Sequence, residues 1–168
     1  MARRDVDLEA CPGATLDDLD AALVELYREE LARRRPGSPL IRLPLESLLL
    51  KIGAALAVGE QAQPTLTGML FFGRDPQLFY PSLTVTFLHF PGTSTARNRA
   101  EDPLYLDNRE FHGALPAIID ATRATIYDRI EKQARVEGFV RHDVPEYPEV
   151  AYREAIVNAV GHRDYGLE

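Results

Sequence analysis

The amino-acid sequence predicts an α+β fold in which helices dominate and a small sheet of about three strands completes the core. Apolar residues recur at helical spacing in several stretches, and one later stretch alternates as a strand does. The 168 residues, 45% hydrophobic and 27% charged, are enough to bury the core of one domain. We expect a linker over 1–14, a helical segment over 15–60 and an α+β segment over 61–166. Residues 167–168 resemble the remnant of a purification tag and are left out of the predicted fold.

Two amphipathic helices are predicted in the first third of the chain. Thr15 is a suitable N-cap with Asp18 in the acidic position of a capping box. The arginine run 33–35 favours the negative end of that helix, and Pro36 stops it. A second helix is expected after Pro44. The two apolar stripes consist of Leu19, Ala22, Leu23, Leu26, Tyr27 and Leu31, and of Leu45, Leu48, Leu49, Ile52 and Leu56.

The middle of the chain predicts a short buried element and then a strand. The stretch 64–73 is apolar but too short for periodicity to separate helix from strand, and Thr65 as an N-cap favours a helix. Residues 73–76 form a turn. The stretch 83–90 is the clearest strand, and apolar groups on both of its faces predict a central position in a sheet. We expect His89 on it to be a hydrogen-bonded core or edge histidine rather than a ligand.

The last third predicts two further strands and two helices. A short strand is expected at 109–112, a long helix at 115–133 and another strand at 138–144. Pro148 can serve as a first-turn residue of a terminal helix. Helical content therefore exceeds strand content.

Charge and cysteine content limit the partners and the compartment. The net charge of −7 argues against a surface that follows the phosphates of a nucleic acid. Cys11 is the single cysteine and sits in the expected N-terminal tail, so it cannot form an internal disulfide. With no signal peptide and no apolar run near the roughly 18 residues of a membrane span, we expect a cytoplasmic protein without a membrane partner.

The terminal helix carries the residues best suited to chemistry. Glu154, Asn158 and His162 fall at i, i+4 and i+8, so their side chains share one sector of the helix. A carboxylate can orient or deprotonate an attacking water, and an amide oxygen suits Mg²⁺. The histidine could contact phosphate or hold the helix end. The alternative is a polar face or a capping role for all three. The residues expected to pack on the core are Ala151, Ala155, Ile156 and Ala159.

Two runs of this sequence resemble one bacterial and archaeal protein family. Residues 153–165 read REAIVNAVGHRDY, and residues 64–77 read PTLTGMLFFGRDPQ. Both are similar to signatures of proteins described as transcriptional regulators or RecG-like ATP-dependent helicases. Residues 17–20 resemble the start of the helix that, in that family, follows a Schlafen-AlbA-type domain. In these proteins a DNA-binding Schlafen-AlbA-type domain precedes a C-terminal region related to the GHKL ATPases.

The resemblance implies roles for the terminal helix. Glu154 and Asn158 correspond to the first and fifth positions of the GHKL N-box, where the glutamate is the general base and the asparagine binds Mg²⁺. The resemblance implies ATP and Mg²⁺ as cofactors of a longer protein, DNA as the partner of an upstream domain, and a possible homodimer. The adenine-binding glycine loop would lie downstream, so this segment alone is expected to bind no cofactor and to lack catalysis.

Two other functions remain open from the sequence. The chain can be a structural or dimerisation module in which internal hydrogen bonds hold Glu154, Asn158 and His162. It can also bind nucleic acid directly through the arginines of 33–35 and 97–99, which the negative net charge disfavours.

Overall fold

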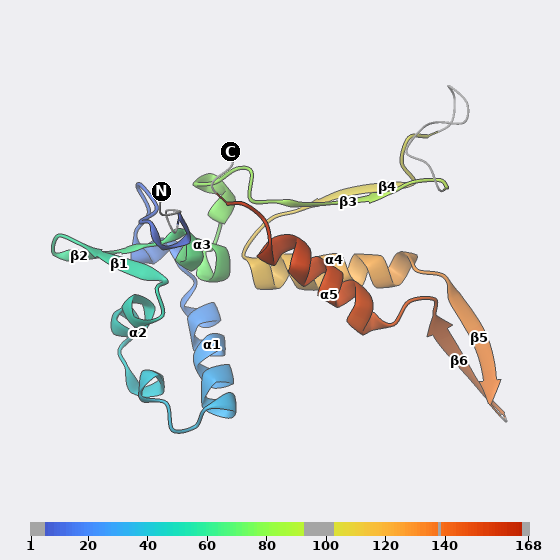
Figure 1. The fold of residues 1–168 in the computed structure, drawn as a ribbon, viewed down its shortest axis with the longest axis horizontal. Coiled ribbons are helices and arrows are strands. Elements are labelled where there is room, and N and C mark those ends of the chain that lie inside the picture. Colours follow the sequence, from blue (N-terminus) through green and yellow to red (C-terminus); the bar gives the residue numbers. More distant parts are fainter. Residues whose placement is uncertain (1–5, 93–102, 138, 166–168) are drawn as a thin grey trace. The chain divides into compact units, whose positions relative to one another are not determined.

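The computed structural model describes residues 6–92, 103–137 and 139–165 (Figure 1). Within them, five α-helices and six strands confirm the helix-rich α+β class. The strands do not form one small sheet: they pair as three separate antiparallel ribbons, β1–β2, β3–β4 and β5–β6. Each ribbon pairs strands that follow each other in the chain, which keeps the loop-closure entropy small.

The chain divides into two compact units. Unit 1 comprises Met1–Leu83, His112–Pro116 and Asp164–Glu168, and unit 2 comprises Thr84–Phe111 and Ala117–Arg163. Each unit is therefore described by itself below.

Unit 1 holds the hydrophobic core. Its elements are α1 (Ala21–Arg34), α2 (Leu45–Lys51), β1 (Ala55–Val58), β2 (Gln61–Pro64) and α3 (Leu66–Phe72), with short 3₁₀ turns at Val6–Leu8, Leu16–Asp18, Pro39–Arg42 and Pro76–Leu78. The core residues are Cys11, Ala14, Leu19, Val24, Leu48, Leu49, Ala54, Ala55, Met69 and Phe72. A second, smaller cluster consists of Leu66, Leu70 and Leu83.

The first predicted helix is two elements. Asp18 Oδ2 accepts hydrogen bonds from the Thr15 backbone N–H (2.8 Å) and hydroxyl (3.0 Å), as expected for the capping box, but this box starts only a 3₁₀ turn. The extended Asp20 then caps α1 by accepting from the Ala22 N–H at 2.9 Å. The break occurs because the Asp20 N–H donates to the Phe72 carbonyl at 2.6 Å, which ties the chain to the end of α3.

The second predicted helix is shorter than expected. α2 ends at Lys51, and Gly53 with a φ of +75° turns the chain into the β1–β2 hairpin, which the sequence pattern missed. Leu56 therefore lies on a strand instead of the helical stripe. The predicted capping role of Thr65 is confirmed: its hydroxyl oxygen accepts from the Gly68 N–H at 3.1 Å and its O–H donates to the Gly53 carbonyl at 2.7 Å.

The segment 6–14 is packed within unit 1, whereas the sequence predicts a linker. The Cys11 N–H donates to the Pro64 carbonyl at 2.7 Å, and the Leu66 N–H donates to the Glu9 carbonyl at 3.1 Å. Cys11 is fully buried rather than part of a tail. Burial raises the pKa of its thiol, which disfavours the reactive thiolate at neutral pH.

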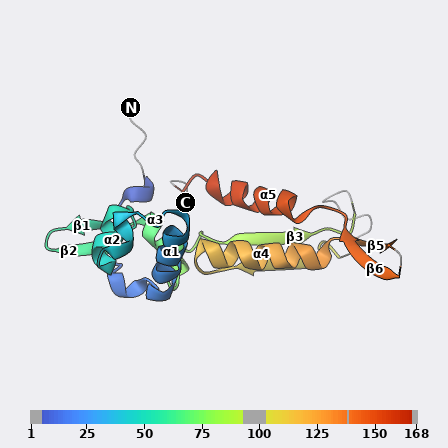
Figure 2. The same cartoon turned by 90° about the horizontal axis from the view of Figure 1, so that it is seen from below.

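Unit 2 is built from two ribbons and two helices. β3 (Val85–His89) pairs with β4 (Asp107–Phe111), and β5 (Lys132–Glu137) pairs with β6 (Val140–Pro145). α4 (Leu115–Arg129), which starts in unit 1, and α5 (Glu149–Gly161) run in opposite directions (Figures 1 and 2). The helices bury Ile118, Thr122, Thr125, Tyr152, Ile156 and Val160.

Two expectations for unit 2, the central position of β3 and the length of the helix that begins at Leu115, need correction. β3 is one half of a two-stranded ribbon rather than a central strand, and Thr86 and Leu88 on it are exposed. His89 is half-buried and lies opposite Asp107 in the ribbon. The long helix stops at Arg129 because the chain reverses there and enters β5, a strand that the sequence pattern missed.

Candidate functional site

The helix that carries the predicted site is held at both ends. Pro148, in an extended conformation, occupies the N-cap position of α5 and not its first turn. Near this end, Arg123 Nη1 of α4 donates to Glu149 Oε1 at 2.5 Å. At the other end, Arg163 Nη1 donates to the Thr84 carbonyl at 3.2 Å. α5 is thus fixed within unit 2, and so is the direction of each of its faces.

The three predicted site residues share one exposed face of α5. Glu154, Asn158 and His162 are all exposed. The buried residues Tyr152, Ile156 and Val160 have the same four-residue spacing. Because the two sets are offset by two residues, or about 200° of helical rotation, they lie on opposite sides of the helix.

The alanines of α5 do not pack as the sequence predicts. Ile156 is buried, but Ala151, Ala155 and Ala159 are exposed, and Val157 and Val150 are exposed beside them. Tyr152 takes the expected place of the alanines. Its hydroxyl has no hydrogen-bond partner among the described residues, and burial raises its pKa.

Glu154, Asn158 and His162 do not bond to one another. Within the described ranges, no side-chain hydrogen bond or ion pair links these residues to each other or to the rest of the chain; the His162 backbone N–H donates to the Asn158 carbonyl at 3.0 Å as an ordinary helix-end bond. The described residues also contain no group of three His, Cys, Asp or Glu that could hold a metal ion. The carboxylate, amide and imidazole groups of this face are therefore exposed on the surface of α5.

The sequence signature at 64–77 has a structural role. A Cβ atom on Gly68 would lie 1.9 Å from the Ala54 carbonyl oxygen, so only glycine fits at this position. Gln77 Nε2 donates to the carbonyls of Leu83 (2.6 Å) and Gly113 (3.1 Å), and its Oε1 accepts from the Gly113 N–H at 2.8 Å. These contacts join distant parts of unit 1.

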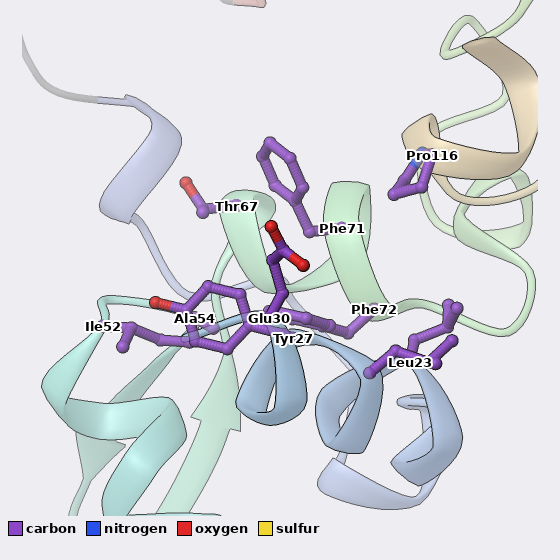
Figure 3. A pocket seen from close by; sticks show the side chains of 10 residues that line it. Leu23, Tyr27, Glu30, Ile52, Ala54, Thr67, Phe71, Phe72 and Pro116 are labelled. Carbon is purple, nitrogen blue, oxygen red and sulfur yellow. The ribbon is translucent and has the colours of Figure 1, made fainter. Parts of the chain in front are cut away.

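A hollow in unit 1 is a second candidate site, which the sequence did not predict (Figure 3). Its volume is about 510 Å³, within the range of small-molecule pockets. Glu30 is the one carboxylate on its wall. Arg34, which donates to Glu30 at 2.5 Å, lowers the pKa of that carboxyl. The lining residues are Leu23, Leu26, Tyr27, Glu30, Ile52, Ala54, Thr67, Phe71, Phe72 and Pro116.

This hollow is suited to holding an apolar group. Most of its wall is aliphatic or aromatic, and the Glu30 carboxylate is already paired with Arg33 (2.9 Å) and Arg34. Sequence patterns could not indicate it, because its lining comes from several separate segments of the chain.

The basic run 33–35 is a helix end, as its position predicts. Arg33 and Arg34 occupy the last turn of α1 and both form ion pairs with Glu30, and Arg35 is the C-cap residue. The other proposed nucleic-acid contact, the arginines of 97–99, lies outside the described residues.

Comparison with known proteins gives one family model and one similar structure. Residues 1–83 match a model described as "Domain of unknown function (DUF8451)". The match ends at Leu83, which is also where the first and longest stretch of unit 1 ends. No curated protein matches the chain.

The similar structure is the crystal structure of the DIP2311 protein from Corynebacterium diphtheriae. Its TM-score is 0.55 at 24% sequence identity, and the alignment covers 96% of this chain. The likeness supports the fold alone. The chain spans 29% of the length of that protein. In the part of the chain that the structure describes, no helix has the length and apolar character needed to cross a membrane.

Proposed function

We propose that this chain is the connecting segment of a longer ATP-binding transcriptional regulator and that α5 supplies half of its nucleotide site. The observation that carries the proposal is the exposed face of α5, on which Glu154, Asn158 and His162 line up opposite the buried face. The resemblance of 153–165 to an N-box gives this face its chemistry. The small share of the crystallised Corynebacterium protein that the chain spans is in keeping with a segment of a larger protein.

The donor types on this face fit Mg²⁺ and a nucleotide. Mg²⁺ prefers hard oxygen ligands and is usually held by one or two protein groups together with water and substrate phosphates. Asn158 Oδ1 would be such a ligand, and Glu154 would orient or deprotonate a water. His162, at the end of α5, would contact phosphate or hold the helix end. When bound, Mg²⁺ supplies charge neutralisation at the phosphates.

The remaining parts of the proposed function lie outside this chain. An upstream domain would bind DNA, and a downstream glycine-rich loop would hold adenine. The longer protein would act in the cytoplasm, where the single, buried Cys11 stays reduced. This segment by itself would neither bind ATP nor hydrolyse it.

Calorimetry tests this function by measuring the binding of Mg-ATP. The protein to be used is the longer one, which extends through the glycine-rich loop. We expect the wild type to bind and Asn158→Ala to bind about tenfold or more weakly, because a ligand to the metal is lost. Glu154→Gln is expected to bind normally but to hydrolyse ATP about 100-fold more slowly, if the wild type hydrolyses it.

Arg153→Gln is the matched control, because Arg153 is exposed on α5 but lies away from the proposed face. It should bind as the wild type does. If the longer wild-type protein binds no ATP even when Mg²⁺ is in excess, the nucleotide function is excluded.

The second candidate function is a structural or dimerisation module without nucleotide binding. The structural role of Gly68 and Gln77 in the shared signature favours it. In this function the exposed face of α5 would pack against a partner, since internal hydrogen bonds of Glu154, Asn158 and His162 are not found among the described residues.

A further inference from the structure

The hollow of unit 1 is held open by contacts within the fold. Two of its lining residues, Ala54 and Phe72, belong to the hydrophobic core. The Asp20 N–H, at the N-cap of α1, donates to the Phe72 carbonyl at 2.6 Å, and Gly68 of α3 packs directly against Ala54. A ligand that enters the hollow therefore does not have to order its walls, which favours binding.

Part of the wall exposes large apolar side chains. Leu26 of α1 is 59% exposed and Phe71 of α3 is 45% exposed, and both line the hollow. Removing such apolar surface from water is favourable. The volume of about 510 Å³ lies within the range for small-molecule pockets. A compact molecule can therefore enter the hollow and cover both side chains.

Three aromatic rings make the wall suitable for an aromatic ligand. Tyr27, Phe71 and Phe72 all line the hollow (Figure 3). The rings of Tyr27 and Phe72 meet edge to face with centroids 5.9 Å apart, and those of Phe71 and Phe72 are tilted by 49° with centroids 6.4 Å apart. Aromatic rings prefer such edge-on and offset arrangements. A further flat ring can therefore extend this cluster.

The charge on the wall is already balanced. Among the described residues that line the hollow, Glu30 is the one charged side chain, and it pairs with Arg33 at 2.9 Å and with Arg34 at 2.5 Å. The Thr67 hydroxyl donates to the Asp7 carbonyl at 2.8 Å. An ion would lose its hydration on entering without meeting a free opposite charge, which is costly. The lining therefore favours an uncharged molecule.

We propose that this hollow binds an uncharged aromatic small molecule, whose ring is buried against Tyr27, Phe71 and Phe72. Burial of the ring and of the exposed parts of Leu26 and Phe71 supplies the affinity, and contacts between aromatic rings add to it. All the lining residues belong to unit 1, and none belongs to α5. The site is therefore distinct from the proposed nucleotide site.

Calorimetry with three compounds that share one ring system tests the site. Naphthol is uncharged at neutral pH, naphthoate is an anion and naphthylmethylamine is a cation. We expect naphthol to bind, and to bind about tenfold or more tightly than either ion, because each ion must lose its hydration. The absence of naphthol binding would overturn the proposal, and so would an equal or tighter affinity for either ion.

Substitutions in the wall show where naphthol binds. Phe71→Ala and Leu26→Asn should each weaken binding about fivefold or more, because apolar contacts with the ring are lost. Both side chains are partly exposed, so both variants are expected to fold, and circular dichroism checks this. Leu78→Ala is the matched control: Leu78 is 76% exposed and lies outside the lining, so binding should not change.

Two further results would contradict the proposal. The first is that naphthol binds the folded Phe71→Ala and Leu26→Asn variants as tightly as the wild type, which would place it elsewhere. The second is that sedimentation shows self-association of the wild type that Phe71→Ala abolishes, which would mean that a second copy occupies the hollow. Neither result depends on Mg-ATP binding, so the failure of this site and the failure of the nucleotide function are distinguishable.

Discussion

Packing requires glycine at position 68, although glycine is unfavourable inside a helix. It lies inside α3, where glycine is about 1 kcal/mol less favourable than alanine. A Cβ atom there would lie 1.9 Å from the Ala54 carbonyl oxygen, a backbone atom that cannot move aside cheaply. The cost of that overlap exceeds the gain in helix propensity.

Gly68→Ala should therefore destabilise the protein by more than about 3 kcal/mol, because α3 must move away from Ala54. Urea denaturation measures the loss. Gly37→Ala is the control: nothing lies within 4 Å of its would-be Cβ, so its free energy of unfolding should change by less than about 0.5 kcal/mol. Equal effects of the two substitutions would contradict the packing argument.

Asp107 links the start of β4 to the end of α4. Its Oδ2 accepts from Arg129 Nη2 at 2.6 Å and from Arg129 Nε at 3.0 Å, and Arg109 Nε lies 3.1 Å away. The hydrogen bonds from Arg129, and then Arg109, lower the pKa of the Asp107 carboxyl. The charged form of this residue therefore stabilises the folded chain.

The lowered pKa of Asp107 determines how the stability of the folded chain depends on pH. A lowered pKa in the folded state gives stability that is present above the unfolded value of about 3.9 and is lost as the pH falls through the folded value. Asp107→Asn should be less stable than the wild type at neutral pH, and the difference should shrink at acidic pH. Denaturation of both proteins at pH 7 and at low pH measures it. A difference that does not depend on pH would contradict the ionic role.

At the scale of elements, α5 has one buried face and one exposed face. Its buried residues Tyr152, Ile156 and Val160 hold it in unit 2, while the candidate site residues on the opposite face have no described partner. The two faces can therefore be changed independently.

Ile156→Ala should cost about 2–4 kcal/mol of stability, because it removes a buried side chain. Glu154→Gln and Asn158→Ala should each stay within about 0.5 kcal/mol of the wild type, since both residues are exposed. Thermal denaturation followed by circular dichroism tests both statements. A large loss for Glu154→Gln would show that this face has a structural partner.

The elements that the sequence predicted well are those with local signals. The capping hydroxyl of Thr65 and the alternation around β3 are such signals, and Pro148 marks the start of α5 although it is the N-cap and not a first-turn residue. The ribbon β1–β2 and the strand β5 were missed because their sequences, ALAV, QAQP and KQARVE, lack a clear alternation. Pairing with the neighbouring strand, not side-chain pattern, determines them.

The candidate site was predictable only in part. The shared sector of Glu154, Asn158 and His162 follows from four-residue spacing, and their exposure is in keeping with it. Tyr152 is buried in place of the alanines, which helical spacing alone does not indicate. The hollow in unit 1 depends on the packing of α1 against α3, which no local pattern encodes.

At the scale of the whole molecule, apolar burial is unevenly distributed. Both hydrophobic clusters of the described residues belong to unit 1. In unit 2 the residues of β3 and β4 are exposed or half-buried, and few side chains are buried among the described residues of this unit. Because local stability follows buried apolar contacts, unit 2 should open more readily.

Native-state hydrogen exchange measures this difference. The backbone amides of α3 should exchange their hydrogens most slowly. The amides of β3 and β4 should exchange faster at the same pH and temperature. Protection of β3 equal to that of α3 would mean that the two units open together as a single cooperative structure.

In the proposed function, the exposed face of α5 holds Mg²⁺ and the nucleotide in the longer protein. A crystal structure of that protein with Mg²⁺ and a non-hydrolysable ATP analogue tests it most directly. The prediction is a Mg²⁺ ion about 2.1 Å from Asn158 Oδ1, with Glu154 in hydrogen-bond reach of a water at the terminal phosphate. A nucleotide bound elsewhere, with the face of α5 packed against protein, would contradict it.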